Sequence, residues 1–165
     1  IVLYSCHTNL DIAKGGVNDV LAQRLGLREV QVVGAEQLLR LGRIPEQTLD
    51  EFLKTVRENL GCPGLRYVDG GKRCSRVAVG GGACGDELLE AARGGCDTFV
   101  TSDVKYNTFW DAWDMGINLI DAGHFYTENP VCTVLAGTLE RAFPELSVRI
   151  SEKHADCMKF FGLPR

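Results

Sequence analysis

The sequence predicts an α/β protein with a mostly parallel sheet flanked by helices. From residue 76 onward, apolar runs of strand length alternate with helix-length segments, and short connections join them. Such alternation is typical of right-handed crossovers between parallel strands. With 165 residues, 45% of them apolar, the chain has the size of one domain and can bury a core. We therefore expect an α/β domain over residues 1–150 and a C-terminal tail over 151–165.

The predicted strands are β-branched or aromatic runs bounded by polar or glycine-rich turns. The runs at 28–34 and 37–44 can pair as a hairpin. The segment 63–73 has a linker-like composition and is either a junction between two lobes or a simple hairpin. Further strands are expected at 1–6, 65–68, 76–81, 97–103, 117–123 and 145–150.

The predicted helices show apolar residues at helical spacing, or residue types that favour helix ends. Pro45 predicts a helix start, with acidic residues in the first turn and Gly61 after the end. Trp110 and Trp113, three positions apart, are typical of a core stripe or of a subunit contact. The helices are expected at 17–25, 45–60, 86–95, 105–116 and 129–143.

Charge and cysteine content exclude several classes of protein. A net charge of −4 and a pI near 5.4 argue against a nucleic-acid surface. The seven cysteines are odd in number and scattered, and no C-x-x-C occurs, so reduced thiols in the cytoplasm are expected.

No secretion signal is visible, and no apolar run reaches the roughly 18 residues that span a bilayer. Because Ile1 begins an expected strand, we also expect that an upstream segment is missing.

Two histidine–carboxylate pairs follow apolar runs. His7 and Asp11 come after IVLY, and His124 and Glu128 come after INLI, with the same spacing of four. Ligand sites collect where parallel strands end, and imidazole with carboxylate suits zinc, iron or manganese. Each pair alone has a simpler interpretation, because Asp11 could cap a turn and Glu128 could be an acidic residue at a helix start. The repetition favours a shared metal site.

Two loops have ambiguous chemistry. The stretch GGGACGD (80–86) could hold a phosphate at a helix N-terminus, but it lacks a P-loop lysine. Glycines that allow a tight turn and close packing are the favoured interpretation. In TSDVKY, three side chains could contact a substrate or a water molecule near the site: Thr101, Asp103 and Lys105. They could also form a helix N-cap with its first-turn charges, and the cap is favoured. His154 is isolated near the C-terminus and is interpreted as a surface residue.

Three motifs resemble the NIF-three-like family, also called GTP cyclohydrolase 1 type 2 homologs or dinuclear metal centre proteins. The motifs are HTNLDIAKGGVNDVLAQRLGL (7–27), VAVGGGACGDELLEAARGGCDTFVTSDVKY (77–106) and INLIDAGHFYTE (117–128). They occur in the family's order, and the resemblance extends over roughly residues 1–150. The resemblance implies a two-lobe α/β fold around two divalent metal ions per subunit, commonly assembled as a homohexameric ring. It implies four metal ligands here: His7, Asp11, His124 and Glu128.

The chain departs from the family pattern at two places. The paired histidines of the family's H-H-P motif have no counterpart, so the four ligands could hold one ion, two weakly, or none. Ser102 and Asn107 stand where family members often carry glycine and histidine. The resemblance implies a divalent-metal-dependent hydrolase that acts on a nucleotide or phosphoester. A non-catalytic metal-binding oligomeric scaffold or regulatory protein is the alternative, and a metal-free nucleotide-binding module is a weaker third.

Overall fold

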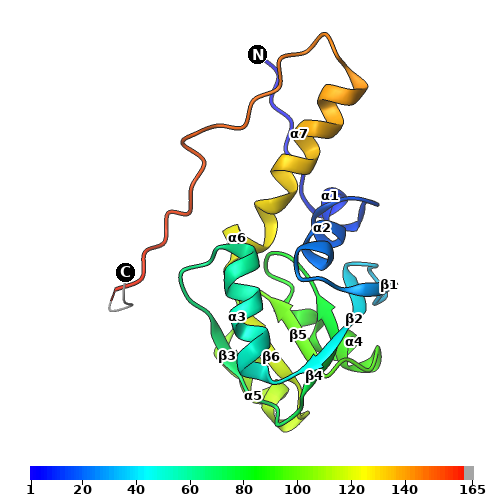
Figure 1. The fold of residues 1–165 in the computed structure, drawn as a ribbon, viewed down its shortest axis with the longest axis vertical. Coiled ribbons are helices and arrows are strands. Elements are labelled where there is room, and N and C mark those ends of the chain that lie inside the picture. The colour runs from blue at the N-terminus through cyan, green and yellow to red at the C-terminus, as the bar shows by residue number, and fades with distance from the viewer. Residues whose placement is uncertain (162–165) are drawn as a thin grey trace.

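A six-stranded mixed sheet forms the centre of the molecule in the computed structural model, which describes residues 1–161 (Figure 1). The strand order is β1-β2-β4-β5-β6-β3, and helices cover both faces. The predicted α/β class is therefore confirmed. The strands are β1 (Arg28–Val33), β2 (Leu39–Gln47), β3 (Arg66–Val68), β4 (Cys74–Val79), β5 (Thr98–Thr101) and β6 (Asn118–Asp121).

The parallel part of the sheet consists of its three central strands. β4 pairs with β5 and β5 pairs with β6 in parallel, as the alternation after residue 76 predicts. β1 and β2 form the expected antiparallel hairpin, which joins the sheet beside β4. β3 lies within the segment 63–73 and adds an antiparallel edge strand next to β6. The strands before and after that segment thus belong to one sheet.

The helices connect the strands or pack at one end of the sheet. α4 and α5 are the crossovers between the parallel strands, and α6 follows β6 directly. They are α1 (Thr8–Ile12), α2 (Val17–Arg24), α3 (Leu49–Leu60), α4 (Leu88–Arg93), α5 (Tyr106–Asp114), α6 (His124–Glu128) and α7 (Pro130–Ala142), with a 3₁₀ turn, η1 (Gly85–Glu87), before α4.

The prediction that Pro45 starts a helix is wrong. Pro45 lies in β2, where the pairing register with β4 shifts between Arg43 and Gln47, and such a bulge tolerates a residue without an N–H. α3 begins four residues later, because Thr48 and Glu51 form a capping box. The Thr48 side chain accepts the Glu51 N–H, and the Glu51 carboxylate accepts the Thr48 N–H.

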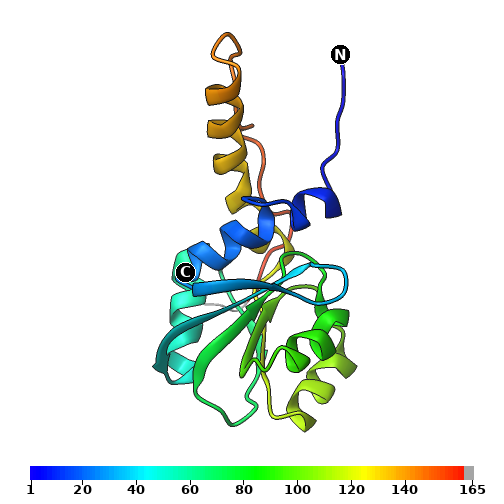
Figure 2. The ribbon, with the colours of Figure 1, turned by 90° about the vertical axis from the view of Figure 1, so that its right-hand side faces the viewer.

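The expected strands at 1–6 and 145–150 are also not formed. Neither run pairs with another strand among residues 1–161, and both are largely exposed. β-branched residues favour an extended chain, but a strand also needs a neighbour for its backbone hydrogen bonds. Both runs lie at the end of the molecule where α7 projects away from the sheet (Figures 1 and 2).

Two hydrophobic clusters, one on each face of the sheet, form most of the core. Side chains alternate along β4, so that Val77 and Val79 pack under α2 and α3 while Ala78 faces α4 and α5. Figure 2 shows α3 on one side of the sheet and α4 and α5 on the other. Trp110 and Trp113 are 52% and 55% exposed, so the core-stripe interpretation of this pair is wrong. No helix among residues 1–161 is long and apolar enough to cross a bilayer.

Candidate metal centre

One cavity of about 710 Å³ brings the four predicted ligands to a common surface. His7 precedes α1 and Asp11 lies within it, while His124 and Glu128 are the first and last residues of α6. All four side chains line this cavity. The two motifs are more than 110 residues apart in sequence, and the fold places α1 and α6 next to α2, which contacts both helices.

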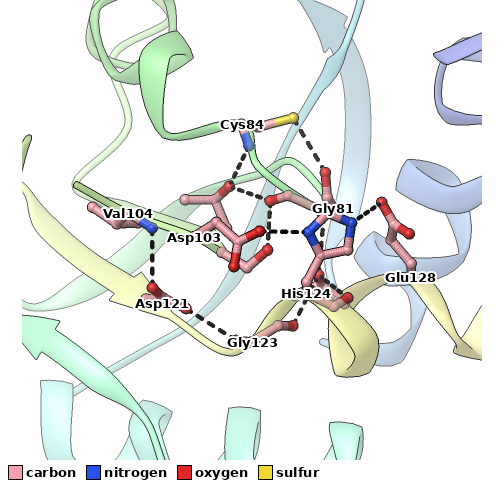
Figure 3. Close-up of polar contacts among 12 residues, drawn as sticks. Gly81, Cys84, Asp103, Val104, Asp121, Gly123, His124 and Glu128 are labelled. Carbon is pink, nitrogen blue, oxygen red and sulfur yellow. Dashed lines mark hydrogen bonds and ion pairs between the residues drawn. The ribbon is translucent and has the colours of Figure 1, made fainter. Parts of the chain in front are cut away.

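His124 is held between two carboxylates (Figure 3). Its Nδ1 lies 2.6 Å from Oδ2 of Asp103, and its Nε2 lies 3.1 Å from Oε1 of Glu128. Each ring nitrogen of His124 thus faces one carboxylate oxygen. Burial lowers the pKa of His124, but the hydrogen bond with Asp103 and the charge of Glu128 outweigh burial, and the pKa lies above its ordinary 6.5.

Asp121 positions both His124 and Asp103. It is the last residue of β6, and its Oδ1 accepts the Gly123 N–H at 3.1 Å, directly before His124. Its Oδ2 accepts the Val104 N–H at 3.1 Å, directly after Asp103. Figure 3 shows these bonds joining the segments that follow β5 and β6. The buried Asp121 side chain thus links the C-terminal ends of β5 and β6, which are neighbouring parallel strands.

The two predicted carboxylate ligands lie in a partly dehydrated and charged environment. Burial raises the pKa of Asp11, and the nearby imidazoles of His7 and His124 oppose that rise. Burial also raises the pKa of Glu128, which His124 opposes and the charge of Asp11 reinforces. The four side chains therefore interact electrostatically across the cavity, and a cation would lower the repulsion between the two carboxylates.

The residues between His7 and Asp11 shape the turn that carries them. The His7 N–H donates to Oδ1 of Asn9 at 2.8 Å, and the hydroxyl of Thr8 lies 3.0 Å from Nδ1 of His7. The Leu10 N–H donates to the His7 carbonyl at 2.7 Å. Threonine and asparagine thus fix the backbone and one ring nitrogen of His7, which gives the HTNLD motif a local physical basis.

The types of side chain at this cavity suit a divalent metal ion. Two imidazoles and two carboxylates that line one cavity are the ligand types of zinc, iron and manganese sites. Among residues 1–161, however, no three histidine, cysteine, aspartate or glutamate side chains converge as they would around an ion. His124 and Glu128 contact each other instead. Coordination by three or more side chains would require these groups to move toward a common point.

The glycine loop before η1 is packed against the site. The Gly81 N–H donates to Oδ1 of Asn18 at 2.6 Å, and the Gly82 N–H donates to the hydroxyl of Thr127 at 3.0 Å. A Cβ on Gly82 would lie 2.3 Å from Oε1 of Glu128. Close packing, the favoured interpretation of GGGACGD, is confirmed, and these two amides are already used and cannot bind a phosphate.

Replacing Gly82 with alanine should damage the site as well as the fold. Gly82 has a φ of +64°, so a Cβ costs about 1–2 kcal/mol in this left-handed conformation. The same Cβ displaces the Glu128 carboxylate, so affinity for Zn²⁺ should fall in calorimetric titrations. Gly61→Ala is the matched control, because Gly61 has a φ of +68° and a Cβ added there would meet nothing within 4 Å. Equal Zn²⁺ affinity in the two variants would contradict the role of Gly82.

The sequence indicates Asp103 as a candidate residue but favours the wrong role for it. The N-cap of α5 is Lys105 and carries no side-chain cap bond, so the cap interpretation of Asp103 is wrong. Lys105 pairs with Asp86 at 3.0 Å, and the Thr101 hydroxyl donates to the Gly82 carbonyl at 3.2 Å. Asp103 has a φ of +51°, an uncommon backbone conformation for a residue other than glycine, which is found at functional sites. That strain becomes visible only in the structure.

Comparison with known proteins agrees with these motifs. The model of the Duf34/NIF3 (NGG1p interacting factor 3) family matches residues 1–156. A GTP cyclohydrolase 1 type 2 homolog from Nostoc sp. is 37% identical over 98% of this chain and 64% of its own length. Its counterpart from Clostridium acetobutylicum is 34% identical over 97% of this chain and 65% of its own length. The chain thus spans somewhat less than two thirds of these curated relatives.

Solved structures show the same fold. A Bacillus cereus protein related to NIF3 superposes with a TM-score of 0.82 at 22% identity, over 95% of this chain and 73% of that protein. A Thermus thermophilus protein superposes with a TM-score of 0.74 at 28% identity, over 86% of this chain and 57% of that protein.

Proposed function

Because the chain belongs to the Duf34/NIF3 family, we propose that it is a divalent-metal-dependent hydrolase that acts on a nucleotide or phosphoester. The name of its relatives, GTP cyclohydrolase 1 type 2 homolog, supports a nucleotide as the substrate class. The ion or ions would be of the zinc, iron or manganese class. Four side chains would hold them: His7, Asp11, His124 and Glu128.

The Asp103–His124 contact is the observation that carries this proposal. Histidines that bind metals usually donate their other ring N–H to a carboxylate, which fixes the ring and raises its basicity. Here Asp103 contacts Nδ1 of His124 at 2.6 Å and leaves Nε2, on the side of Glu128, as the nitrogen for an ion. Asp121 in turn holds the backbone on both sides of the pair.

A bound divalent ion would supply Lewis-acid chemistry, polarising a carbonyl or phosphoryl group of the substrate. The chain's own residues supply the rest. Asp103 keeps the His124 ring in one orientation, and Asp11 and Glu128 provide negative charge that attracts the cation.

We also propose a cytoplasmic location, which the seven cysteines support, because all lie in the described part and none forms a disulfide.

Metal content tests the proposed centre. Protein purified without added metal should contain a divalent ion by elemental analysis, and His7→Ala and His124→Ala should each lose it. Asp103→Asn should weaken Zn²⁺ binding by about 10- to 100-fold, because it releases the His124 ring. Glu140→Gln, a carboxylate change on the exposed face of α7, is the control and should bind like wild type. Unchanged metal content in both histidine variants would refute the centre.

Catalysis is tested separately from metal binding. Turnover of a panel of nucleotides and phosphoesters should be measurable for the wild type and lost in Asp11→Asn. Equal turnover by the two proteins would identify a contaminant as the source and contradict the hydrolase.

The second candidate function is a non-catalytic, metal-binding oligomeric scaffold, and a surface feature favours it. A groove of about 410 Å³ lies beside edge strand β3. Arg66 and four aromatic residues line it, and each aromatic side chain is more than half exposed: Tyr67, Tyr106, Trp110 and Trp113. Aromatic residues and arginine are enriched at protein interfaces. A homo-oligomer would cover these rings, and metal binding without turnover would favour this function.

A further inference from the structure

All three histidines of the chain line the same cavity. The sequence contains only His7, His124 and His154, and each belongs to the wall that Asp11 and Glu128 also form. His154 comes from the C-terminal segment 154–158, every residue of which lines this cavity. The interpretation of His154 as an isolated surface residue is therefore incomplete, because the ring is exposed toward the candidate metal centre.

His154 is seated against α6, the helix that carries two of the four proposed ligands. Its ring packs on Phe125 with 5.1 Å between ring centroids and 50° between planes. Phe125 directly follows His124 in sequence and lines the same cavity. The His154 N–H donates to the Ser151 carbonyl at 3.1 Å, which forms a turn before the ring. Among residues 1–161 no hydrogen bond to either ring nitrogen of His154 is formed, so both nitrogens are available.

A carboxylate on the same segment adds negative charge to the cavity wall. Oδ1 of Asp156 accepts the Met158 N–H at 3.0 Å, and Oδ2 is buried. Burial and the Asp156 carboxylate raise the pKa of Tyr126, so the phenol lies beside this carboxylate. Asp156 lines the cavity together with His154, so its charge would attract a cation there.

We propose that His154 is a further metal ligand, which the C-terminal segment delivers to the centre. This inference rests on the proposed function, because it assumes that His7 and His124 bind the ion. Zinc sites commonly combine three protein ligands with one open position, and neutral imidazole is a common ligand. With His154, three imidazoles of the described residues line one cavity.

The histidine ring nitrogens give a direct test. In ¹⁵N-detected NMR spectra of the full chain, each of the three imidazoles gives its own pair of nitrogen signals. On titration with Zn²⁺, the signals of all three rings should shift together with one stoichiometry. Shifts confined to His7 and His124 would overturn the role of His154 and leave the proposed centre intact. No shift in any ring would overturn both.

A matched pair of variants on the same segment provides an independent measurement. His154→Gln should weaken Zn²⁺ binding by about tenfold or more in competition titrations with a chelator. Lys153→Gln removes the neighbouring side chain, which does not line the cavity, and should bind like wild type. Both residues are exposed, and far-UV circular dichroism should show that both variants keep the fold. Wild-type affinity in His154→Gln would refute the proposal.

Discussion

Replacing Arg40 with methionine is expected to lower the free energy of unfolding by about 3 kcal/mol. The Arg40 side chain is only 2% exposed, and its Nε forms an ion pair with Asp19. Its remaining nitrogens donate to the carbonyls of Gln37 at 2.9 Å, Leu39 at 3.3 Å and Ile12 at 3.1 Å. Methionine fills much of the volume but leaves these acceptors unpaired. The expected loss is at the low end for a broken buried pair, because Asp19 is 30% exposed.

The same substitution should also affect the candidate centre. Ile12 is the last residue of α1 and follows Asp11, so the bond from Arg40 ties the helix that carries a proposed ligand to β2. Urea denaturation checks the loss of stability, and Zn²⁺ titration checks the loosening of α1. Arg43→Met is the control, because Arg43 is 60% exposed and its pair with Glu29 at 3.4 Å should contribute little. Equal stability of the two variants would contradict this role of Arg40.

The pH dependence of the Arg40 variant has a definite sign. Burial raises the pKa of Asp19, but the Gly15 N–H and the Arg40 guanidinium outweigh burial, and the pKa lies below its ordinary 3.8. A carboxylate whose pKa is lowered by folding stabilises the protein above its unfolded pKa and loses that contribution as the pH falls through the folded value. The stability difference between wild type and Arg40→Met should therefore shrink below pH 3.8.

Phe99→Ala is expected to have the other large effect, a loss of about 3–5 kcal/mol in the free energy of unfolding. Phe99 is fully buried in β5, opposite Ala78 of β4 and Leu119 of β6. Its removal leaves a cavity between the sheet and the helices α4 and α5. Because Asp103 follows β5 by two residues, any shift of this strand would also disturb the His124 ring.

Thermal and urea denaturation measure this loss, and one exposed phenylalanine offers a matched control. Phe143, which follows α7, is 48% exposed, so Phe143→Ala should change stability by no more than about 0.5 kcal/mol. A loss below about 1 kcal/mol in Phe99→Ala would show that the core closes around the deletion, contrary to the packing described here.

Much of the central fold can be predicted from the sequence, because its elements have strong local signals. The strands and helices after residue 76 appear in the expected order, and the hairpin of β1 and β2 follows from two adjacent apolar runs. The strands expected at 1–6 and 145–150 are not formed for a tertiary reason, because a local preference for an extended chain cannot provide a strand to pair with. At Pro45, the capping box of Thr48 and Glu51 determines where the helix begins.

At the candidate site, too, local features can be predicted from the sequence and tertiary contacts cannot. The spacing of each histidine–carboxylate pair is local, so the sequence indicates both pairs, although it does not predict the short helices α1 and α6 at these pairs. The contact of Asp103 with His124 depends on β5 and β6 being neighbours in the sheet, which no spacing of 21 residues encodes. The approach of His154 to Phe125 depends on the path of the C-terminal segment across the cavity.

The absence of a side chain at position 82 also constrains how this protein can evolve. A Cβ at position 82 would lie 2.3 Å from Oε1 of Glu128, so a larger residue there requires the Glu128 carboxylate to move or the residue at position 128 to be shorter. A shorter residue at 128, in turn, would remove a proposed ligand before any benefit at 82 could arise. Substitutions at positions 82 and 128 are therefore coupled, because each residue limits what the other position can carry.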